Sequence, residues 1–483
     1  MLWQLPILRD ERFKALVETA ISRSTGGEII TMRNNNTLSR AILASVLCGP
    51  GAVMAGGFSL NEQSASAMGV ANAGTAANPE NATTVFFNPA GMSQLSGTNV
   101  SFGAAVLDID AEVKDGKASA TNNVGAPVSG GDGGDIADPA VLPNIFVTHE
   151  VNDTVDVGIG LHAPYGLKAD YDDDFVGRYF ADKTELTAIA LSPSIAVNNG
   201  EGFSMGIGVN IIYAKGRLTK FQDYSNFGLP QEGYFDTEGD DIGATVSFGL
   251  LYELTDRTQI GLSGQTGTTL NLEGDATLTN FPQVTSSGVN LVTAKEDANV
   301  PLEIPESLTF GIRHRLTDTV TLLAGATWAK WSRFEALDVE SGEDGGTISA
   351  VGGPKYGDDD LIGHVSENWN DTWQVNVGAI WQATPAWAFK AGYAYDESPV
   401  NENYRTARIP SNDRQWLTLG TQWNDAPSGW TVDVAAGVLL FDDVDVNERE
   451  YTVDDEPVGN AASYSGTYEL SAWSAGVQVS KAF

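Results

Sequence analysis

Apolar and polar residues alternate along most of the chain, in segments of about ten residues. From Phe203 to Ile211 every second residue is apolar, and the residues between them are Ser, Gly and Asn. The segment 432–438 follows the same period of two, which places its apolar side chains on one face of a β-strand. Segments of this kind begin near 14 positions: Thr98, Asn144, Val155, Thr184, Gly202, Asp241, Thr258, Glu306, Thr319, Asn370, Ala386, Arg414, Trp430 and Tyr468.

The connections between these segments favour a transmembrane barrel over a soluble sheet. Some are tight turns, whereas 108–140, 271–303 and 335–367 are long and acidic. Short turns at one end and long loops outside the cell are typical of bacterial barrels, which have an even number of strands. The chain also finishes with an apolar strand that ends on Phe483. We therefore expect an all-β protein, a 14-stranded antiparallel transmembrane β-barrel over residues 97–483.

The start of the chain indicates secretion. Residues 32–55 have a positive start at Arg33, an apolar stretch over 41–54 and small residues at the expected cleavage site. This is the pattern of a signal peptide, and we interpret residues 1–31 as an upstream extension from a wrong start codon. Cys48, the only cysteine, would be removed with the signal. A secreted chain with barrel strands belongs in the outer membrane of a Gram-negative cell.

Residues 56–96 lie between the signal and the first strand and show no alternation. They are rich in Ala, Gly, Ser and Asn and carry almost no charge. Small residues let short helices and turns pack closely inside a barrel. We predict that this segment is a hatch that plugs the lumen.

Composition excludes several classes of function. The formal charge of −36 argues against nucleic-acid binding, because phosphate contacts need clustered Lys and Arg. The 4 histidines have no metal-ligand spacing, so we expect no metal and no cofactor. The acidic runs 171–174 and 357–360 could bind a divalent cation that bridges lipopolysaccharide. Solvated extracellular loops are the favoured interpretation of these runs.

Several motifs resemble a known family along the whole mature chain. The hatch begins Gly57-Phe-Ser-Leu-Asn-Glu-Gln and continues to Phe87-Asn-Pro-Ala-Gly-Met. His162-Ala-Pro-Tyr-Gly-Leu, Tyr395-Asp-Glu-Ser-Pro-Val and Ile409-Pro-Ser-Asn-Asp-Arg follow in order. Together they resemble the FadL-type long-chain fatty acid transporters. The resemblance implies capture at an extracellular groove, transfer to an inner pocket beside the hatch, and sideways release through a gap in the wall.

The predicted gap lies in the third strand. Pro164 has no N–H for the strand ladder, so it marks an edge or a bulge. In a closed barrel an interrupted ladder indicates a local opening. We therefore predict a lateral gate at Pro164, Tyr165 and Gly166, with Ala163 in contact with the ligand. The alternative is an ordinary strand end near the loop.

The resemblance also assigns contacts between hatch and wall. Asn88, Pro89 and Ala90 match the family's hatch motif, and Asp396 and Arg414 match its partners on the wall. A buried Asp–Arg pair is costly unless it is hydrogen-bonded further, so we expect Asn88 to complete it. The alternative is a structural turn without movement.

The resemblance is less complete at the site where the family binds the carboxylate of its ligand. Lys220 falls where the family carries a basic residue near the ligand's headgroup, and a Lys makes a single-point contact. The family's second basic position falls near Val365, with His364 beside it as a further ligand contact. A solvated Lys220 at a strand end is the alternative. A hydrocarbon cargo would need no cation, so this departure leaves two cargoes open.

The leading hypothesis is passive uptake of long-chain fatty acids, and its closest rival is uptake of aromatic or aliphatic hydrocarbons by the same route. An outer-membrane lipid-hydrolysing enzyme is a remote alternative, because no histidine lies in a Ser- or Asp-containing signature. A general porin is disfavoured by the apolar hatch. We expect a monomer without enzymatic activity, whose partners are the hydrophobic cargo, outer-membrane lipid and lipopolysaccharide.

Overall fold

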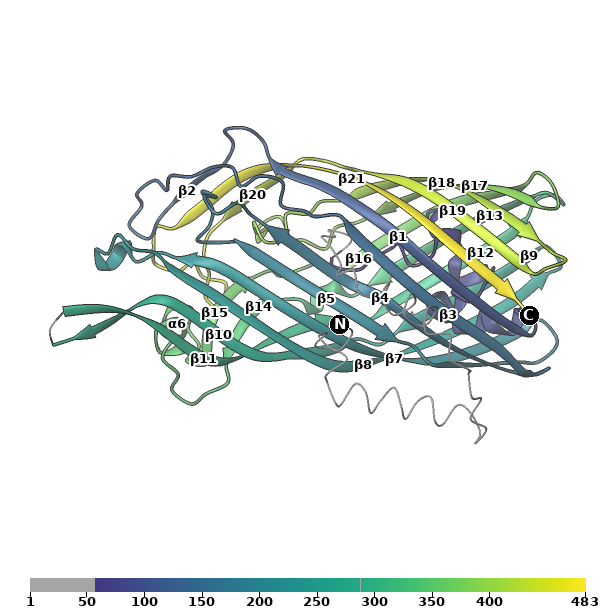
Figure 1. Cartoon of the computed structure of the whole chain (residues 1–483), viewed down its shortest axis with the longest axis horizontal. Helices are drawn as coiled ribbons and strands as arrows, with labels where there is room; N and C mark the ends of the chain where they lie inside the picture. The colour runs from purple at the N-terminus through teal and green to yellow at the C-terminus, as the bar shows by residue number, and fades with distance from the viewer. Residues whose placement is uncertain (1–56, 287) are drawn as a thin grey trace, which may run out of the picture. The chain divides into compact units, whose positions relative to one another are not determined.

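The computed structural model describes residues 57–286 and 288–483. The predicted extension, the signal peptide and residue 56 of the predicted hatch lie outside the described residues. Antiparallel strands surround a group of short helices in the described part (Figure 1). None of the helices described is long and apolar enough to cross a membrane.

The secondary structure consists of long strands and a few short helical turns. The strands are β1 (Thr98–Val113), β2 (Ser119–Thr121), β3 (Ala140–Asn152), β4 (Val155–Asp170), β5 (Lys183–Leu191), β6 (Ser194–Asn198), β7 (Phe203–Gln222), β8 (Gly233–Thr255), β9 (Thr258–Gln265), β10 (Thr268–Thr285), β11 (Gly288–Ile304), β12 (Ser307–Arg315), β13 (Val320–Ala329), β14 (Ala336–Ser341), β15 (Leu361–Ser366), β16 (Thr372–Gln382), β17 (Trp387–Asp396), β18 (Arg414–Asp425), β19 (Trp430–Phe441), β20 (Val444–Glu448) and β21 (Ser463–Ala482). The helical turns are α4 (Ala65–Met68), η2 (Thr75–Ala77), α5 (Thr84–Phe87), η3 (Pro89–Gln94), η4 (Ser225–Phe227), η5 (Trp331–Arg333) and α6 (Ser349–Tyr356).

These segments make a closed wall of 14 antiparallel strands, as the alternation predicted. Some wall strands are broken into two labelled segments: β5 and β6, β9 and β10, β11 and β12, β13 and β14, β15 and β16, and β19 and β20. The last strand closes on the first, because β21 pairs with β1 from Asn99↔Ala482 to Val113↔Tyr468. A closed ladder leaves no unpaired edge, as a strand wall in hydrocarbon requires.

The outward side chains mark the height of the membrane. Leu419 on β18 is 70% exposed, which is unfavourable in water and favourable in lipid. Trp381, Trp387 and Trp430 lie at the end with short turns, and Trp473 lies toward the long loops. Aromatic residues gather at both interfaces of such barrels, so these Trp residues indicate the two edges of the apolar band.

Above this band the wall continues where the sequence predicted loops. Residues 271–303 are mostly the paired strands β10 and β11, and much of 335–367 is the pair β14 and β15 with α6 between them. Inward Leu272 alternates with outward Glu273 and Asp275. The composition of this segment is typical of a loop, because its outward residues face water and many are charged. Its inward face is apolar, as in the strands below it.

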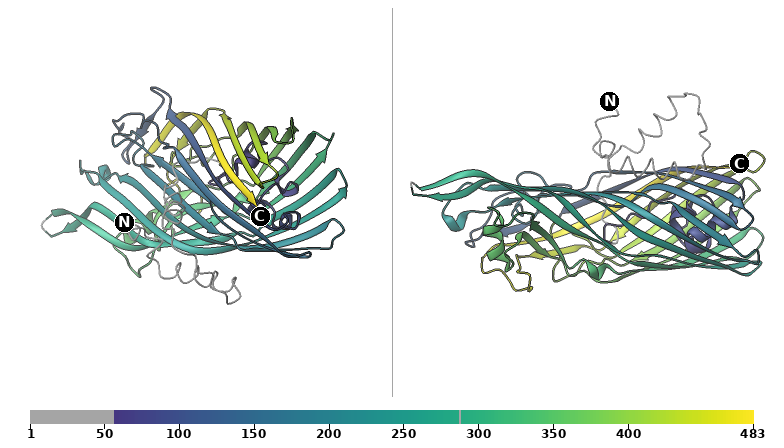
Figure 2. Two further views of the ribbon diagram at one scale, coloured as in Figure 1. Left: turned by 45° about the vertical axis from the view of Figure 1, so that its right-hand side comes forward. Right: turned by 90° about the horizontal axis from the view of Figure 1, so that it is seen from below.

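Hatch residues 57–96 pack against the inside of the wall at the end where the C-terminus lies (Figures 1 and 2). Ten of the wall positions that face the hatch are glycines, and a Cβ added at each of them would clash with or tightly contact a hatch atom. We call them the glycine belt: Gly158, Gly206, Gly249, Gly261, Gly311, Gly325, Gly378, Gly392, Gly420 and Gly476. Strand register aligns members of the belt, since Gly311 pairs with both Gly261 and Gly325. The hatch backbone occupies the space of the missing side chains.

One buried ionic cluster, which we call the hatch anchor, joins the hatch to the wall. Nζ of Lys390 on β17 lies 2.7 Å from Glu80 of the hatch and 3.1 Å from Asp433 on β19. It also donates to Oγ of Ser66 at 2.9 Å. Gln422 donates a further hydrogen bond to Asp433. The side chains of Lys390 and Asp433 are each 1% exposed, so their charges are shielded from water and depend on one another.

Candidate functional site

The candidate site begins at an irregularity in β4, the third strand of the wall. In the described chain, β3 pairs with β4 only as far as Ile145↔Leu161, although β3 extends to Ala140. On the other side, the register of β4 with β5 shifts between His162 and Tyr165. Ala163 and Pro164 therefore lie in a bulge at the point where β4 leaves β3. This is the place where the sequence predicted a lateral gate.

The first residues of the hatch pair with this bulge from inside the barrel. Leu60 N–H donates to the Pro164 carbonyl at 3.0 Å, and Gly166 N–H donates to the Phe58 carbonyl at 2.9 Å. The side chain of Gln63 donates to the Ala163 carbonyl at 2.6 Å. Backbone groups that the strand ladder leaves free are thus satisfied by the hatch. The first residues of the hatch are therefore hydrogen-bonded directly to the bulge.

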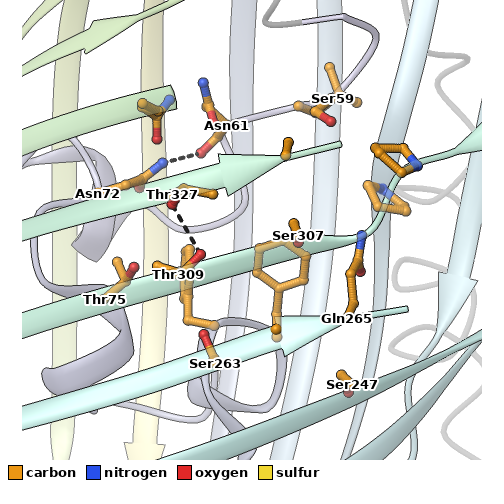
Figure 3. A pocket seen from close by; sticks show the side chains of 18 of the residues that line it. Ser59, Asn61, Asn72, Thr75, Ser247, Ser263, Gln265, Ser307, Thr309 and Thr327 are labelled. Carbon is orange, nitrogen blue, oxygen red and sulfur yellow. Dashed lines mark hydrogen bonds between the residues drawn. The ribbon is translucent and has the colours of Figure 1, made fainter. Parts of the chain in front are cut away.

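A cavity of about 210 Å³ lies directly beside the bulge (Figure 3). Pro164 and Tyr165 line it on one side, and hatch residues such as Ser59 and Leu60 line it on another. Most of the labelled side chains are uncharged and polar, among them Asn61, Asn72, Thr309 and Thr327. Thr309 and Thr327 share a hydrogen bond of 3.0 Å. We call this space the polar cavity.

A second space lies farther from the short turns and is almost entirely apolar. Its lining includes Phe58, Leu167, Leu272, Leu302, Phe334 and Ile409, together with Thr184. Its volume is about 50 Å³. Outward residues of the wall at this level, such as Glu273, are polar, so the space lies above the apolar band. We call it the apolar pocket.

Phe58 of the hatch separates the two spaces. Its ring lines the apolar pocket, whereas the next residues, Ser59 and Leu60, line the polar cavity. The ring packs edge-on against Trp331, with 4.6 Å between ring centroids, and also against Phe334 and Tyr165. Aromatic pairs of this kind stabilise beyond the area that they bury. The residue that closes the pocket therefore belongs to the segment that holds the bulge.

The structure brings Lys220 and His364 to one small cavity, as the resemblance implied, but both are already paired. Lys220 lies 3.8 Å from Glu450, which Lys355 also contacts at 2.6 Å. Lys355 and Lys220 hold the pKa of the buried Glu450 carboxyl at about 2, despite its burial. His364 contacts Asp338 at 2.6 Å and Ser366 at 2.9 Å. Both side chains are therefore engaged by residues of the wall and its loops.

The wall pair Asp396 and Arg414 forms as expected, and Nε of Arg414 donates to Asp396 at 2.8 Å. The expectation that Asn88 completes this pair is wrong. Asn88 donates to the carbonyls of Ala76 and Leu250, and its own Oδ1 accepts from Ala90 N–H as the cap of η3. Its hydrogen-bonding capacity is used on the hatch and on β8, which places it away from the pair.

Pro89 and Ala90 serve two different contacts with the wall. Pro89 lines the polar cavity together with Asp396 and Arg414. Both Pro89 and Ala90 pack against Gly206 of the glycine belt. The hatch motif therefore does meet the wall, mainly at β7 and β8.

The sequence did not predict Arg408 as a site residue; its guanidinium donates to Thr184, which lines the apolar pocket. Arg408 stands one position before the motif that begins at Ile409, and that neighbour was the only available signal. Three buried carboxyls, Glu448, Asp182 and Glu367, lie near it, and each favours its charged form. Burial raises the pKa of Glu448 to about 7 and that of Glu367 to about 8, so these two acids are partly or largely uncharged at neutral pH.

A closed barrel with an outward apolar band, an internal hatch and an interrupted third strand defines a transport protein of the outer membrane. The family model described as "Outer membrane protein transport protein (OMPP1/FadL/TodX)" matches residues 46–483, and the chain belongs to this family. It is therefore an outer-membrane channel for hydrophobic substrates and not an enzyme.

Relatives in the family carry different names. The chain is 29% identical over 424 residues to the 47 kDa outer membrane protein of Pasteurella multocida, and the alignment covers 84% of this chain and 92% of that protein. It is 25% identical over 454 residues to the long-chain fatty acid transport protein of Escherichia coli O6:H1, covering 88% and 94%.

Solved structures share the fold. A Pseudomonas aeruginosa FadL homologue superimposes with a TM-score of 0.76 at 22% identity, over 88% of this chain and 99% of that one. The toluene transporter TodX of Pseudomonas putida gives 0.60 at 18% identity, over 83% and 94%.

Proposed function

We propose that this protein takes up long-chain fatty acids by passive transport across the outer membrane. Cargo is caught at the extracellular end, held in the apolar pocket, and released sideways at Ala163–Gly166. The observation that carries this proposal is the position of residues 58–60, which close the pocket with Phe58 and pair with the bulge through Leu60. One movement of this segment opens both ends of the path.

The volumes support a moving segment. At about 50 Å³ the apolar pocket is smaller than usual ligand sites, which hold several hundred Å³. An alkyl chain fits only when lining side chains shift, and Phe58 is the lining residue that the hatch supplies.

Uptake of aromatic or aliphatic hydrocarbons is the second candidate. It is favoured by the pairing of Lys220 with Glu450 and of His364 with Asp338, since these two side chains are not free for a carboxylate. Cells with and without the gene distinguish the two cargoes when given labelled oleate or labelled toluene. If uptake of neither compound depends on the gene, both candidates are wrong.

Deletion of Pro164 tests the route itself. Between His162 and Tyr165, β4 advances three residues while β5 advances two, so removing one residue eliminates the register shift and lets β4 pair continuously. We expect gene-dependent uptake to fall at least about tenfold, since a closed ladder leaves no lateral opening. Folded barrel in the outer membrane is measured in parallel. Deletion of Gly116 in an exposed turn is the control. Unchanged uptake by the folded bulge deletion would exclude lateral release.

A further inference from the structure

Arg408 is a buried cation without a carboxylate in direct contact among the described residues. Its side chain donates to the carbonyls of Lys183 and Thr219, at 3.3 and 3.0 Å, and to Oγ1 of Thr184 at 3.1 Å. The residue is 3% exposed. Within the described chain none of its ion-pair or hydrogen-bond partners is a carboxylate. Other buried cations here, such as Lys390 and Arg414, do have carboxylate partners.

A guanidinium buried without a carboxylate in direct contact is costly to fold, because removing a charge from water is expensive. Glu448, Asp182 and Glu367 lie near enough to favour the charged form of Arg408, but none of the three forms a salt bridge or hydrogen bond with it. Glu448 accepts the backbone N–H of Ala407 at 2.7 Å, and Asp182 accepts from Thr219 and Tyr234. Glu367 accepts from Trp369 and Thr406. A guanidinium has five N–H donors, and three neutral oxygens do not exhaust its capacity or its charge.

The guanidinium adjoins the apolar pocket. Thr184, which receives its hydrogen bond, lines the pocket, and so does the next residue, Ile409. The remaining lining is aliphatic or aromatic for the most part, with Leu272 and Leu302 on the facing strands. A cation beside an alkyl-sized hydrophobic surface matches a molecule with an anionic head and an apolar tail.

We propose that Arg408 binds the carboxylate of an amphiphilic cargo whose alkyl chain occupies the apolar pocket. This assignment rests on the proposed function and makes it more specific, because it selects anionic amphiphiles over neutral hydrocarbons. It also replaces Lys220 as the headgroup residue, since Glu450 already holds Lys220. A carboxylate accepts two hydrogen bonds from a guanidinium, which gives orientation as well as affinity.

Binding to the full-length barrel in lipid nanodiscs tests the assignment. Oleate and oleyl alcohol have the same chain and differ in the charged head. We expect the unmodified protein to bind oleate at least about tenfold more tightly, as a hydrogen bond to a charged group provides. Arg408→Gln keeps donors for the neighbouring carbonyls and removes the charge. It is expected to abolish this preference and to leave the affinity for oleyl alcohol within about twofold.

Three further variants keep the test decisive. Arg408→Lys restores a cation and should recover part of the preference, while Lys220→Met should retain all of it. Leu272→Trp fills the pocket and should weaken both ligands alike. If Leu272→Trp weakens both ligands and Arg408→Gln binds oleate normally, the Arg408 assignment is overturned and the proposed function stands. If Leu272→Trp changes neither ligand, the pocket is not the cargo site and both ideas fail. Heat-dependent mobility on gels confirms that each variant is folded.

Discussion

Lys390→Met is expected to destabilise the folded protein by about 3–5 kcal/mol and to loosen the hatch. The substitution removes the cation that Glu80 and Asp433 share, and the side chain of Asp433 is 1% exposed. The two carboxylates then repel each other, and water reaches the buried Asp433 only if the hatch moves away. Glu80 belongs to the hatch, whereas Asp433 belongs to a continuous wall strand. We therefore expect the hatch to move and the wall strand to keep its position.

Thermal unfolding and thiol labelling measure the two effects separately. With Cys48 replaced by Ser, a Cys introduced at the fully buried Ser64 reports whether the hatch is exposed to a maleimide. Lys295→Met is the matched control, because Lys295 pairs with Asp275 at 3.0 Å on the exposed outer face. The triple variant Lys390→Met, Glu80→Gln, Asp433→Asn should recover much of the stability. If Lys390→Met labels and unfolds like Lys295→Met, the anchor does not hold the hatch.

The wall is the part of this molecule that its sequence predicts best. A strand that faces lipid on one side and a packed lumen on the other must alternate, and Phe203 to Ile211 on β7 does so visibly. The signal weakens above the membrane, where the outward residues of β10 and β11 are charged. There the period of two persists in Leu272 and Ala276, but acidity gives the segment the composition of a loop. The bulge could be predicted from Pro164, because the missing N–H of a proline interrupts a strand ladder at that residue in any fold.

The site is harder to predict because it depends on contacts between distant segments. Glu80 and Lys390 are 310 positions apart, and the hatch has no period that would reveal its orientation. Asn88 was assigned to the wrong wall partner for this reason. Its actual partners are backbone carbonyls, which no residue pattern marks. Arg408 resembles any solvated arginine until the apolar pocket is seen beside it.

Gly392→Ala is expected to displace the hatch from its contact with the glycine belt and to open a path for ions. A Cβ at this position would overlap the backbone of Val70 and Ala71, and a backbone cannot rotate away as a long side chain can. Overpacking of a fitted interior costs about 1–3 kcal/mol. The wall can keep its ladder, because Gly392 pairs with Gly378 through backbone groups that the added methyl group does not touch. The hatch therefore moves and the barrel persists.

Conductance of the purified barrel in planar bilayers shows whether this displacement occurs. The unmodified protein should conduct weakly, and Gly392→Ala should give frequent openings. Gly363→Ala is the control, since a Cβ there meets Val339 only at an ordinary 3.8 Å. Gly261→Ala on β9 should act like Gly392→Ala, because a Cβ there meets the backbone of Ala76. If both belt variants conduct no more than Gly363→Ala, the hatch tolerates the added methyl groups. Close packing against the glycine belt would then not be what keeps the lumen closed.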